Sequence, residues 1–219
     1  MNLFFKTLFA YAKYFFSVWN EPKRYNQLYS LIDQIHPKNI MEIGTWRGER
    51  AKSMIIRAQK YSPSQNIFYY GFDLFEDISP AILNEEISKQ PPAMEKVKND
   101  LNKTGANIAL YKGNTKKVFP EVISSLPKMD FIFIDGGHSL ETIQNDWDYA
   151  SRLIHSGTVV IFDDYWPDRQ DAGAKPIVDA INKYLYEVKV LPTYDVFINS
   201  GRKRLIIKFA QVQKYDQFN

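Results

Sequence analysis

Short apolar segments alternate with amphipathic segments along this 219-residue chain, and this alternation limits its fold more than any other feature. Apolar residues at helical spacing first occupy 22–36, and five strand-like runs then each lead into a helical segment. The expected strands are 39–44, 66–75, 107–113, 129–135 and 157–165. The expected helices after them are 48–61, 80–105 with a break near Pro91-Pro92, 115–126, 139–154 and 174–187. The pattern predicts a three-layer α/β domain with a mostly parallel sheet.

The last strands of this sheet should come from residues 188–212, which read as two strands around the turn Asn199-Ser200-Gly201. A hairpin joins antiparallel strands, so the final strand should run against the others. The expected fold is therefore a Rossmann-like sheet of seven strands, mostly parallel, with an antiparallel strand from the C-terminal hairpin.

Composition narrows the classes of partner and chemistry. The chain has 28 Lys and Arg against 25 Asp and Glu, and a net charge of +3 is too small to argue for nucleic-acid binding. It has no Cys, which excludes disulfides, zinc–thiolate sites and thiol nucleophiles. The absence of Cys also fits a reducing compartment, so we expect a cytoplasmic protein.

The aromatic-rich segment 1–21 is expected to be a helical extension of a single domain over 22–219. Lys6 and Lys13 interrupt its apolar run, which is then too broken for a transmembrane span. A helix packed on the domain, or on a second copy in a homodimer, is the favoured interpretation. Peripheral membrane contact by residues 1–20 is the alternative.

A glycine loop, Gly44-Thr45-Trp46-Arg47-Gly48, follows the first sheet strand. A dinucleotide fingerprint would place glycine where Trp46 stands, so a nicotinamide cofactor is disfavoured. Asp73 ends the next strand, where a carboxylate can accept hydrogen bonds from ribose hydroxyls. Glu42 adds a carboxylate suited to a cationic ligand. Alternatively, these glycines only form a tight turn and Asp73 is a strand-end acid.

Acids also end the fourth and fifth strands, in FIFIDGGH (131–138) and VVIFDDYW (159–166). Open parallel sheets bind ligands at this end of their strands. Asp135, Asp163 and Asp164 could converge there on one divalent ion, since hard ions prefer carboxylate oxygens. Two alternatives stay open: these acids cap the segments that follow them, or they contact ligands without a metal.

Two of these segments resemble a known family. EIGTWRGERA (42–51) resembles motif I of the class I S-adenosylmethionine (SAM) methyltransferases. The stretch 131–166 is similar to the later motifs of small-molecule O-methyltransferases, above all the family-24 group and the macrocin and catechol O-methyltransferases. The resemblance covers about residues 25–210, although Glu49 and Arg50 are unusual in the loop.

The resemblance implies where the cofactor binds. The glycine loop would wrap the methionine part of SAM, with Glu42 near its amino group and Asp73 on its ribose. Residues after the third strand would contact adenine, and Asp135 would close the site. The implied cofactor-binding residues are Glu42, Gly44, Thr45, Trp46, Gly48, Asp73, Asn114, Thr115 and Asp135.

The resemblance also implies a catalytic centre. In the catechol-type enzymes, acids at the positions of Asp135, Asp163 and Asp164 bind Mg²⁺, which lowers the pKa of a substrate hydroxyl. The base of those enzymes lies three residues after the first acid, where this chain has His138. Imidazole titrates near neutral pH, so His138 is the candidate base. Alternatively, His138 stacks on substrate or bonds to the backbone at the helix start.

The resulting expectation is a SAM-dependent methyltransferase that methylates an oxygen of a small metabolite, such as a sugar or polyketide-like molecule. Transfer to nitrogen stays open. Two other classes of protein also stay open. One is a metal-dependent hydrolase or hydroxylase-like enzyme that uses the same acids, and the other is a non-catalytic SAM-binding partner subunit.

Overall fold

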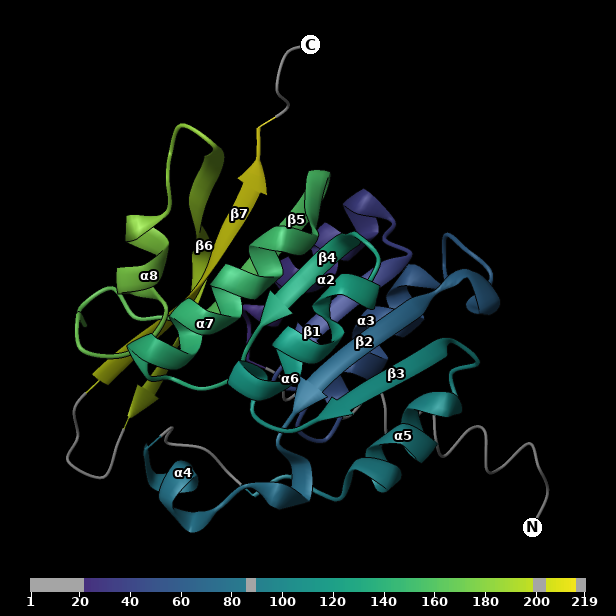
Figure 1. Ribbon diagram of the computed structural model, residues 1–219. Helices are drawn as coiled ribbons and strands as arrows, with labels where there is room; N and C mark the ends of the chain where they lie inside the picture. Colours follow the sequence, from purple (N-terminus) through teal and green to yellow (C-terminus); the bar gives the residue numbers. More distant parts are fainter. Residues whose placement is uncertain (1–21, 86–89, 199–203, 216–219) are drawn as a thin grey trace.

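The computed structural model describes residues 22–85, 90–198 and 204–215, which form one sheet with helices on both faces (Figure 1). The extension 1–21 and the turn 199–201 lie outside the described residues. The strands are β1 (Asn39–Ile43), β2 (Phe68–Asp73), β3 (Asn107–Lys112), β4 (Met129–Ile134), β5 (Ile154–Tyr165), β6 (Tyr186–Ile198) and β7 (Arg204–Lys214). The helices are α2 (Tyr25–Ile35), α3 (Glu49–Ala58), α4 (Pro80–Glu85), α5 (Met94–Asn102), α6 (Thr115–Val122), α7 (Leu140–Ala150) and α8 (Lys175–Ala180).

The seven strands lie in the order β3-β2-β1-β4-β5-β7-β6. Neighbours from β3 to β5 pair in parallel, and β7 is antiparallel to both β5 and β6. The predicted fold class is confirmed. The strand order reverses between β1 and β4, and such a switch point is where open α/β sheets bind ligands.

Each face of the sheet has its own hydrophobic core, because successive strand residues point to opposite sides. In β4, Ile132 and Ile134 pack with α6, α7 and α8, whereas Phe131 and Phe133 pack with α2, α3 and α5. This arrangement gives the expected three layers. It also explains why β4 is apolar at every position from 131 to 134, since neither face of the strand meets water.

The structure shortens one predicted helix. Residues 174–187 were expected to be helical, but α8 ends at Ala180 and β6 already begins at Tyr186. Ile181 leaves the helix in an extended conformation, and residues 182–185 turn into the strand. The apolar residues keep their helical spacing beyond Ala180, although the helix ends there.

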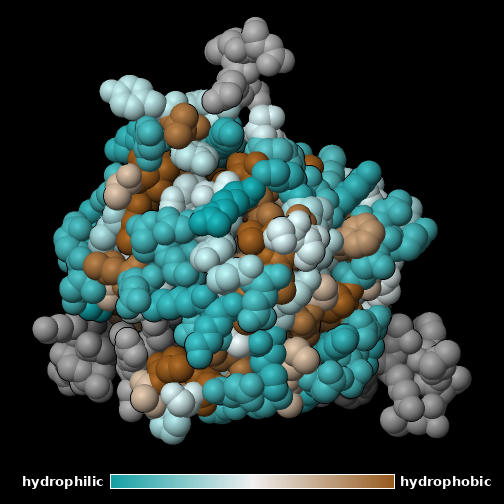
Figure 2. All heavy atoms as spheres, in the orientation of Figure 1, coloured by the Kyte–Doolittle hydropathy of each residue, from teal (hydrophilic) through white to brown (hydrophobic). Residues whose placement is uncertain are grey.

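The surface seen in Figure 2 is mainly hydrophilic over α6 and α7, and apolar side chains gather near α4. At one edge of the sheet, the strand β6 exposes Tyr194, Val196 and Phe197. None of the helices within the described residues has the length and apolar character needed to cross a membrane.

Candidate functional site

A pocket of about 320 Å³ opens at the carboxyl ends of β1 to β4, at the switch point of the sheet. It brings together seven of the residues singled out from the sequence, namely Gly44, Trp46, Asp73, Asn114, Thr115, Asp135 and His138. Ile78, Ile82 and Pro91 add an apolar side to it. The pocket thus combines an apolar wall with a few convergent polar groups, as ligand sites commonly do.

The glycine loop is held against β4 by close backbone contact. Gly44 has φ +95°, and a Cβ built on it would lie 1.9 Å from the carbonyl oxygen of Asp135. Gly48, with φ +73°, begins α3. Only glycine fits the first position, because a side chain there would collide with the backbone of Asp135.

Asp73 fixes the other side of this loop. Its carboxylate accepts hydrogen bonds from the backbone N–H groups of Trp46 and Phe75, each at 2.7 Å. Burial raises the pKa of Asp73, and these two backbone donors oppose the rise. A carboxylate has about four lone-pair sites, so Asp73 can still accept a hydroxyl group from a ligand in the pocket.

Glu42 lies fully buried beneath the loop. Its Oε2 accepts a short hydrogen bond from the hydroxyl of Tyr69, which also contacts the Thr45 hydroxyl at 3.2 Å. Its Oε1 has no hydrogen-bond partner among the described residues, and burial raises the pKa of Glu42 to about 8. A buried acceptor without a donor fits a cationic N–H group from a ligand.

Asn114 and Thr115 lie where β3 leads into α6. The Asn114 side chain caps the helix by accepting from the backbone N–H of Lys116 at 2.9 Å. Asn145 of α7 donates to the Thr115 hydroxyl at 3.2 Å. Both predicted residues therefore line the pocket in fixed positions, at the end opposite the acids of β5.

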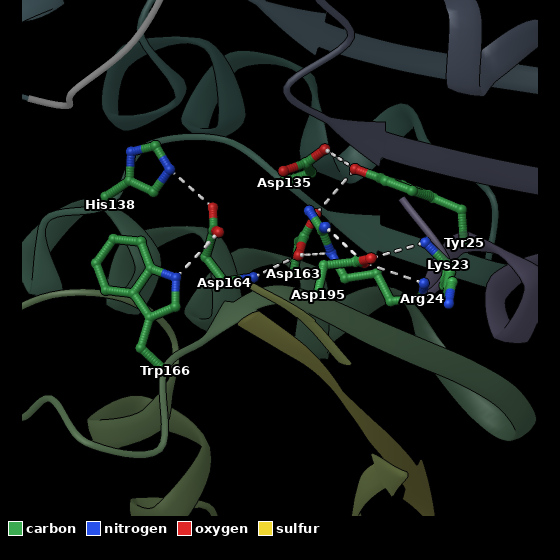
Figure 3. A network of polar contacts seen from close by, with 9 residues as sticks. All are labelled: Lys23, Arg24, Tyr25, Asp135, His138, Asp163, Asp164, Trp166 and Asp195. Carbon is green, nitrogen blue, oxygen red and sulfur yellow. Dashed lines mark hydrogen bonds and ion pairs between the residues drawn. The ribbon is translucent and has the colours of Figure 1, made fainter. Parts of the chain in front are cut away.

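Asp163, at the end of β5, forms a bidentate ion pair with Arg24 (Figure 3). The Nε and Nη2 atoms of Arg24 each lie 2.8 Å from a carboxylate oxygen of Asp163. Tyr25 donates its hydroxyl to Asp163 Oδ2 at 2.9 Å, and Asp195 of β6 accepts from Arg24 Nη1 at 3.2 Å. Burial raises the pKa of Asp163, and the guanidinium opposes that rise.

Asp135 is half-buried in the pocket wall, and its Oδ2 lies 3.5 Å from the Tyr25 hydroxyl. Burial raises its pKa well above the usual range, and the negative charges of Asp163 and Asp164 raise it further. Asp135 does not cap the helix that follows, since the side chain of Ser139 caps α7.

Asp164 turns away from Asp163, as Figure 3 shows. Its backbone has φ +52°, a left-handed conformation that is strained for a non-glycine residue. Its carboxylate lies 2.7 Å from His138 Nε2 and accepts from Trp166 Nε1 at 3.2 Å. The His138 and Trp166 rings stack with their centroids 5.4 Å apart. His138 is thereby fixed beside the pocket by a carboxylate and an aromatic face.

The three aspartates do not form the predicted Mg²⁺ site. Asp163 faces Arg24 while Asp164 faces His138, so the two adjacent carboxylates diverge. No group of three or more His, Asp or Glu side chains in the described part of the chain is arranged to hold a metal ion. Metal binding stays a prediction, because sequence spacing fixes where each strand ends but not which partner each side chain meets.

The sequence did not reveal Arg24 and Tyr25 beside the acids, nor Thr142 and Asp146 in the pocket wall. Arg24 and Tyr25 lie at the start of α2, in a stretch that was predicted only as a helix with one apolar face. No motif marks them. The one available signal was indirect: buried acids at neighbouring strand ends need a cation, and a basic residue far away in sequence can supply it.

Comparison with known proteins places the chain in a family. The profile of the family-24 methyltransferase domain matches residues 41–165, more than half of the chain. The uncharacterized protein R132 of Acanthamoeba polyphaga mimivirus is 28% identical over 107 residues, which are 47% of this chain and 46% of that protein. The chain thus matches about half the length of this curated relative.

Solved structures share the fold at low sequence identity. The O-methyltransferase TomG of Streptomyces achromogenes, in complex with SAM, has a TM-score of 0.60 at 14% identity, covering 87% of this chain and 78% of that one. An O-methyltransferase of Bacillus cereus, in complex with SAH, has a TM-score of 0.62 at 16% identity, covering 89% and 81%. These likenesses show the class I SAM-dependent methyltransferase fold, and the family profile shows that the chain belongs to the family-24 methyltransferases.

Proposed function

We propose that this protein transfers a methyl group from SAM to an oxygen of a small hydroxylated acceptor. The observation that carries the proposal is the pocket at the switch point, where the Gly44 backbone and the Asp73 carboxylate meet. TomG and the Bacillus cereus enzyme, which share this fold, are both O-methyltransferases. A sugar or polyketide-like acceptor remains our preferred substrate class.

The residues of the pocket suggest how SAM binds. The loop from Gly44 to Gly48 would hold the methionine part, and the free Oε1 of Glu42 would accept from its amino group. Asp73 would accept the ribose hydroxyls. Asn114 and Thr115 would lie by adenine, which would pack on the apolar side of the pocket.

His138 is the proposed general base. SAM, when bound, supplies an activated methyl group that an acceptor oxygen attacks in line. His138 lines the pocket, and Asp164 holds its ring from the Nε2 side at 2.7 Å. A histidine oriented by a carboxylate can take the proton of the acceptor hydroxyl and is stabilised when it becomes charged. Asp135 would act by closing the pocket next to the reacting atoms.

We do not assign Mg²⁺ a step in this reaction, because its predicted ligands are engaged with Arg24 and His138. A metal-dependent hydrolase is disfavoured for the same reason, since it would need these carboxylates as metal ligands. A non-catalytic SAM-binding subunit stays a candidate, and the His138–Asp164 pair favours the enzyme over it. A homodimer through the N-terminal segment and a cytoplasmic location stay predictions, as does membrane contact by residues 1–20.

The proposal is tested by titrating the purified protein with SAM in a calorimeter, and then by incubating it with radiolabelled SAM and a panel of hydroxylated and amine acceptors. We expect one SAM per chain and label transfer to a hydroxylated acceptor. SAM binding without transfer to any acceptor would favour the non-catalytic subunit. Absence of SAM binding would contradict the proposal.

A further inference from the structure

We propose that Arg24 is the resident cation of this site and occupies the position at which related enzymes would use a divalent ion. Arg24 lies outside residues 41–165, the region that identifies the family. The inference concerns the same site as the proposed function, but it can be tested by ion binding alone, without SAM or an acceptor.

The carboxylate of Asp163 has no lone pair left for an ion. Its Oδ1 accepts from Arg24 Nε at 2.8 Å and from the backbone N–H of Asp164 at 2.6 Å. Its Oδ2 accepts from Arg24 Nη2 at 2.8 Å and from the Tyr25 hydroxyl at 2.9 Å. A carboxylate offers about four lone-pair directions, and all four are used here. An ion could bind Asp163 only by displacing Arg24 or the Tyr25 hydroxyl.

Displacement of Arg24 is unfavourable because the arginine is itself fixed. Its side chain is 9% exposed, and its Nη1 donates to Asp195 Oδ2 at 3.2 Å. Asp195 also accepts from the backbone N–H groups of Lys23 and Arg24, at 2.8 and 3.1 Å. These contacts join the start of α2 to β5 and β6. A displaced guanidinium would leave a buried charge without its partner, which is strongly destabilising.

The guanidinium of Arg24 also offsets the negative charge of the acids, as a divalent ion would. The Tyr25 hydroxyl donates to Asp163 and lies 3.5 Å from Asp135 Oδ2, so the positive charge of Arg24 lies near both carboxyls rather than one. The Arg24 guanidinium lies 4.8 Å from the Tyr25 ring centroid, and that of Arg50 lies 4.0 Å from it. Arg24 touches no pocket-lining atom in these contacts, so it is a positioning residue.

The test measures Mn²⁺ binding by electron paramagnetic resonance, with Mn²⁺ as a probe for Mg²⁺. The proteins compared are the full-length wild type, Arg24→Gln, Arg24→Lys and the double variant Arg24→Gln/Asp163→Asn. Arg57→Gln is the matched control, because Arg57 pairs with Asp33 between α2 and α3, away from the acids. Circular dichroism follows folding, and we expect Arg24→Gln to lower the melting temperature by about 10 °C.

We expect the wild type, Arg24→Lys and Arg57→Gln to leave Mn²⁺ in its free aqueous form. Arg24→Gln should bind one Mn²⁺ at least tenfold more tightly than the wild type, and the added Asp163→Asn should abolish that binding. Stoichiometric Mn²⁺ binding by the wild type that Asp163→Asn removes would overturn the proposal. A folded Arg24→Gln that binds no Mn²⁺ would overturn it as well. If Arg24→Gln does not fold, the wild-type and Arg24→Lys titrations still decide.

Discussion

At the scale of single residues, two adjacent aspartates at the end of β5 have different tasks. Asp163 is a fully hydrogen-bonded partner of a buried arginine, whereas Asp164 adopts a strained backbone and orients His138. Strain of this kind persists where the surrounding structure holds a residue for a purpose. The two carboxylates point in different directions, as adjacent side chains of a strand do, and each therefore meets its own partner.

The proposed base gives the first prediction. His138→Ala should lower the turnover number about 10²-fold or more, the usual contribution of general-base catalysis, and leave SAM affinity within about threefold. Added imidazole should restore part of the activity. His155→Ala is the control, because His155 forms a similar pair with Asp130, at 3.1 Å, near the start of β5. Full activity of His138→Ala would show that another group takes the proton.

Glu42 gives a prediction about pH. Its folded-state pKa of about 8 exceeds its ordinary value of 4.5, so the folded protein binds more protons than the unfolded chain between these values. The contribution of Glu42 to the free energy of unfolding is fully present below pH 4.5. It is lost as the pH rises towards 8, at roughly 1 kcal/mol per pH unit. Urea unfolding from pH 5 to 8 should show this decline, and Glu42→Gln should remove the part of it that comes from Glu42.

The control for that series is Glu141→Gln, since Glu141 is a largely exposed helix residue paired with Lys116. It should keep the wild-type decline with pH. A Glu42→Gln variant that loses stability with pH as the wild type does would mean that Glu42 is ionised in the folded protein across this range.

At the scale of elements, the proposed SAM site depends on the glycine loop between β1 and α3. Gly44→Ala should cost about 3 kcal/mol or more and abolish SAM binding, because the new methyl group would collide with the Asp135 carbonyl. Gly105→Ala is the control for backbone strain alone: its φ is +77°, but the nearest atom is 3.5 Å away. It should cost about 1 kcal/mol and leave SAM binding unchanged.

Melting curves and SAM titration of both variants check this prediction. Equal losses in the two variants would show that the left-handed backbone, rather than the close contact with β4, is what position 44 requires.

Most elements could be predicted from the sequence because their cause is local. The strand 131–134 is apolar at every position since both faces are buried, and the Pro91-Pro92 break separates α4 from α5 as expected. The end of α8 could not be predicted, because the apolar spacing continues through Tyr184 and Leu185 although both are exposed and outside the helix.

The site was predictable to the extent that it depends on strand ends. Gly44, Asp73 and Asp135 follow from that rule, and the structure places all three on one pocket. The position of a strand end does not predict which side chains pair with Asp163 and Asp164. Arg24 comes from a helix 139 residues away in sequence, and only tertiary packing brings it to β5.

At the scale of the whole molecule, α2 connects the N-terminal part of the chain to the site through Arg24. The predicted domain boundary before residue 22 can be tested by deleting residues 1–21. SAM affinity should stay within about threefold, since the pocket is lined by residues between 43 and 146. If the extension forms a dimer contact, light scattering should show a dimer for the full chain and a monomer for the shortened one.

Loss of SAM binding on deletion would contradict the boundary and place part of the site in residues 1–21. An unchanged mass in solution would contradict a dimer through the extension. The exposed apolar residues Tyr194, Val196 and Phe197 of the edge strand β6 would then be the next surface to examine for self-association.

The most direct test of the central claim, a SAM site whose cation is an arginine, is calorimetric titration of the wild type with SAM. The titration is done once with Mg²⁺ and once with EDTA. We predict one SAM per chain, with the same affinity and enthalpy in both buffers. Binding that requires Mg²⁺ would contradict the role of Arg24, and no binding in either buffer would contradict the SAM site itself.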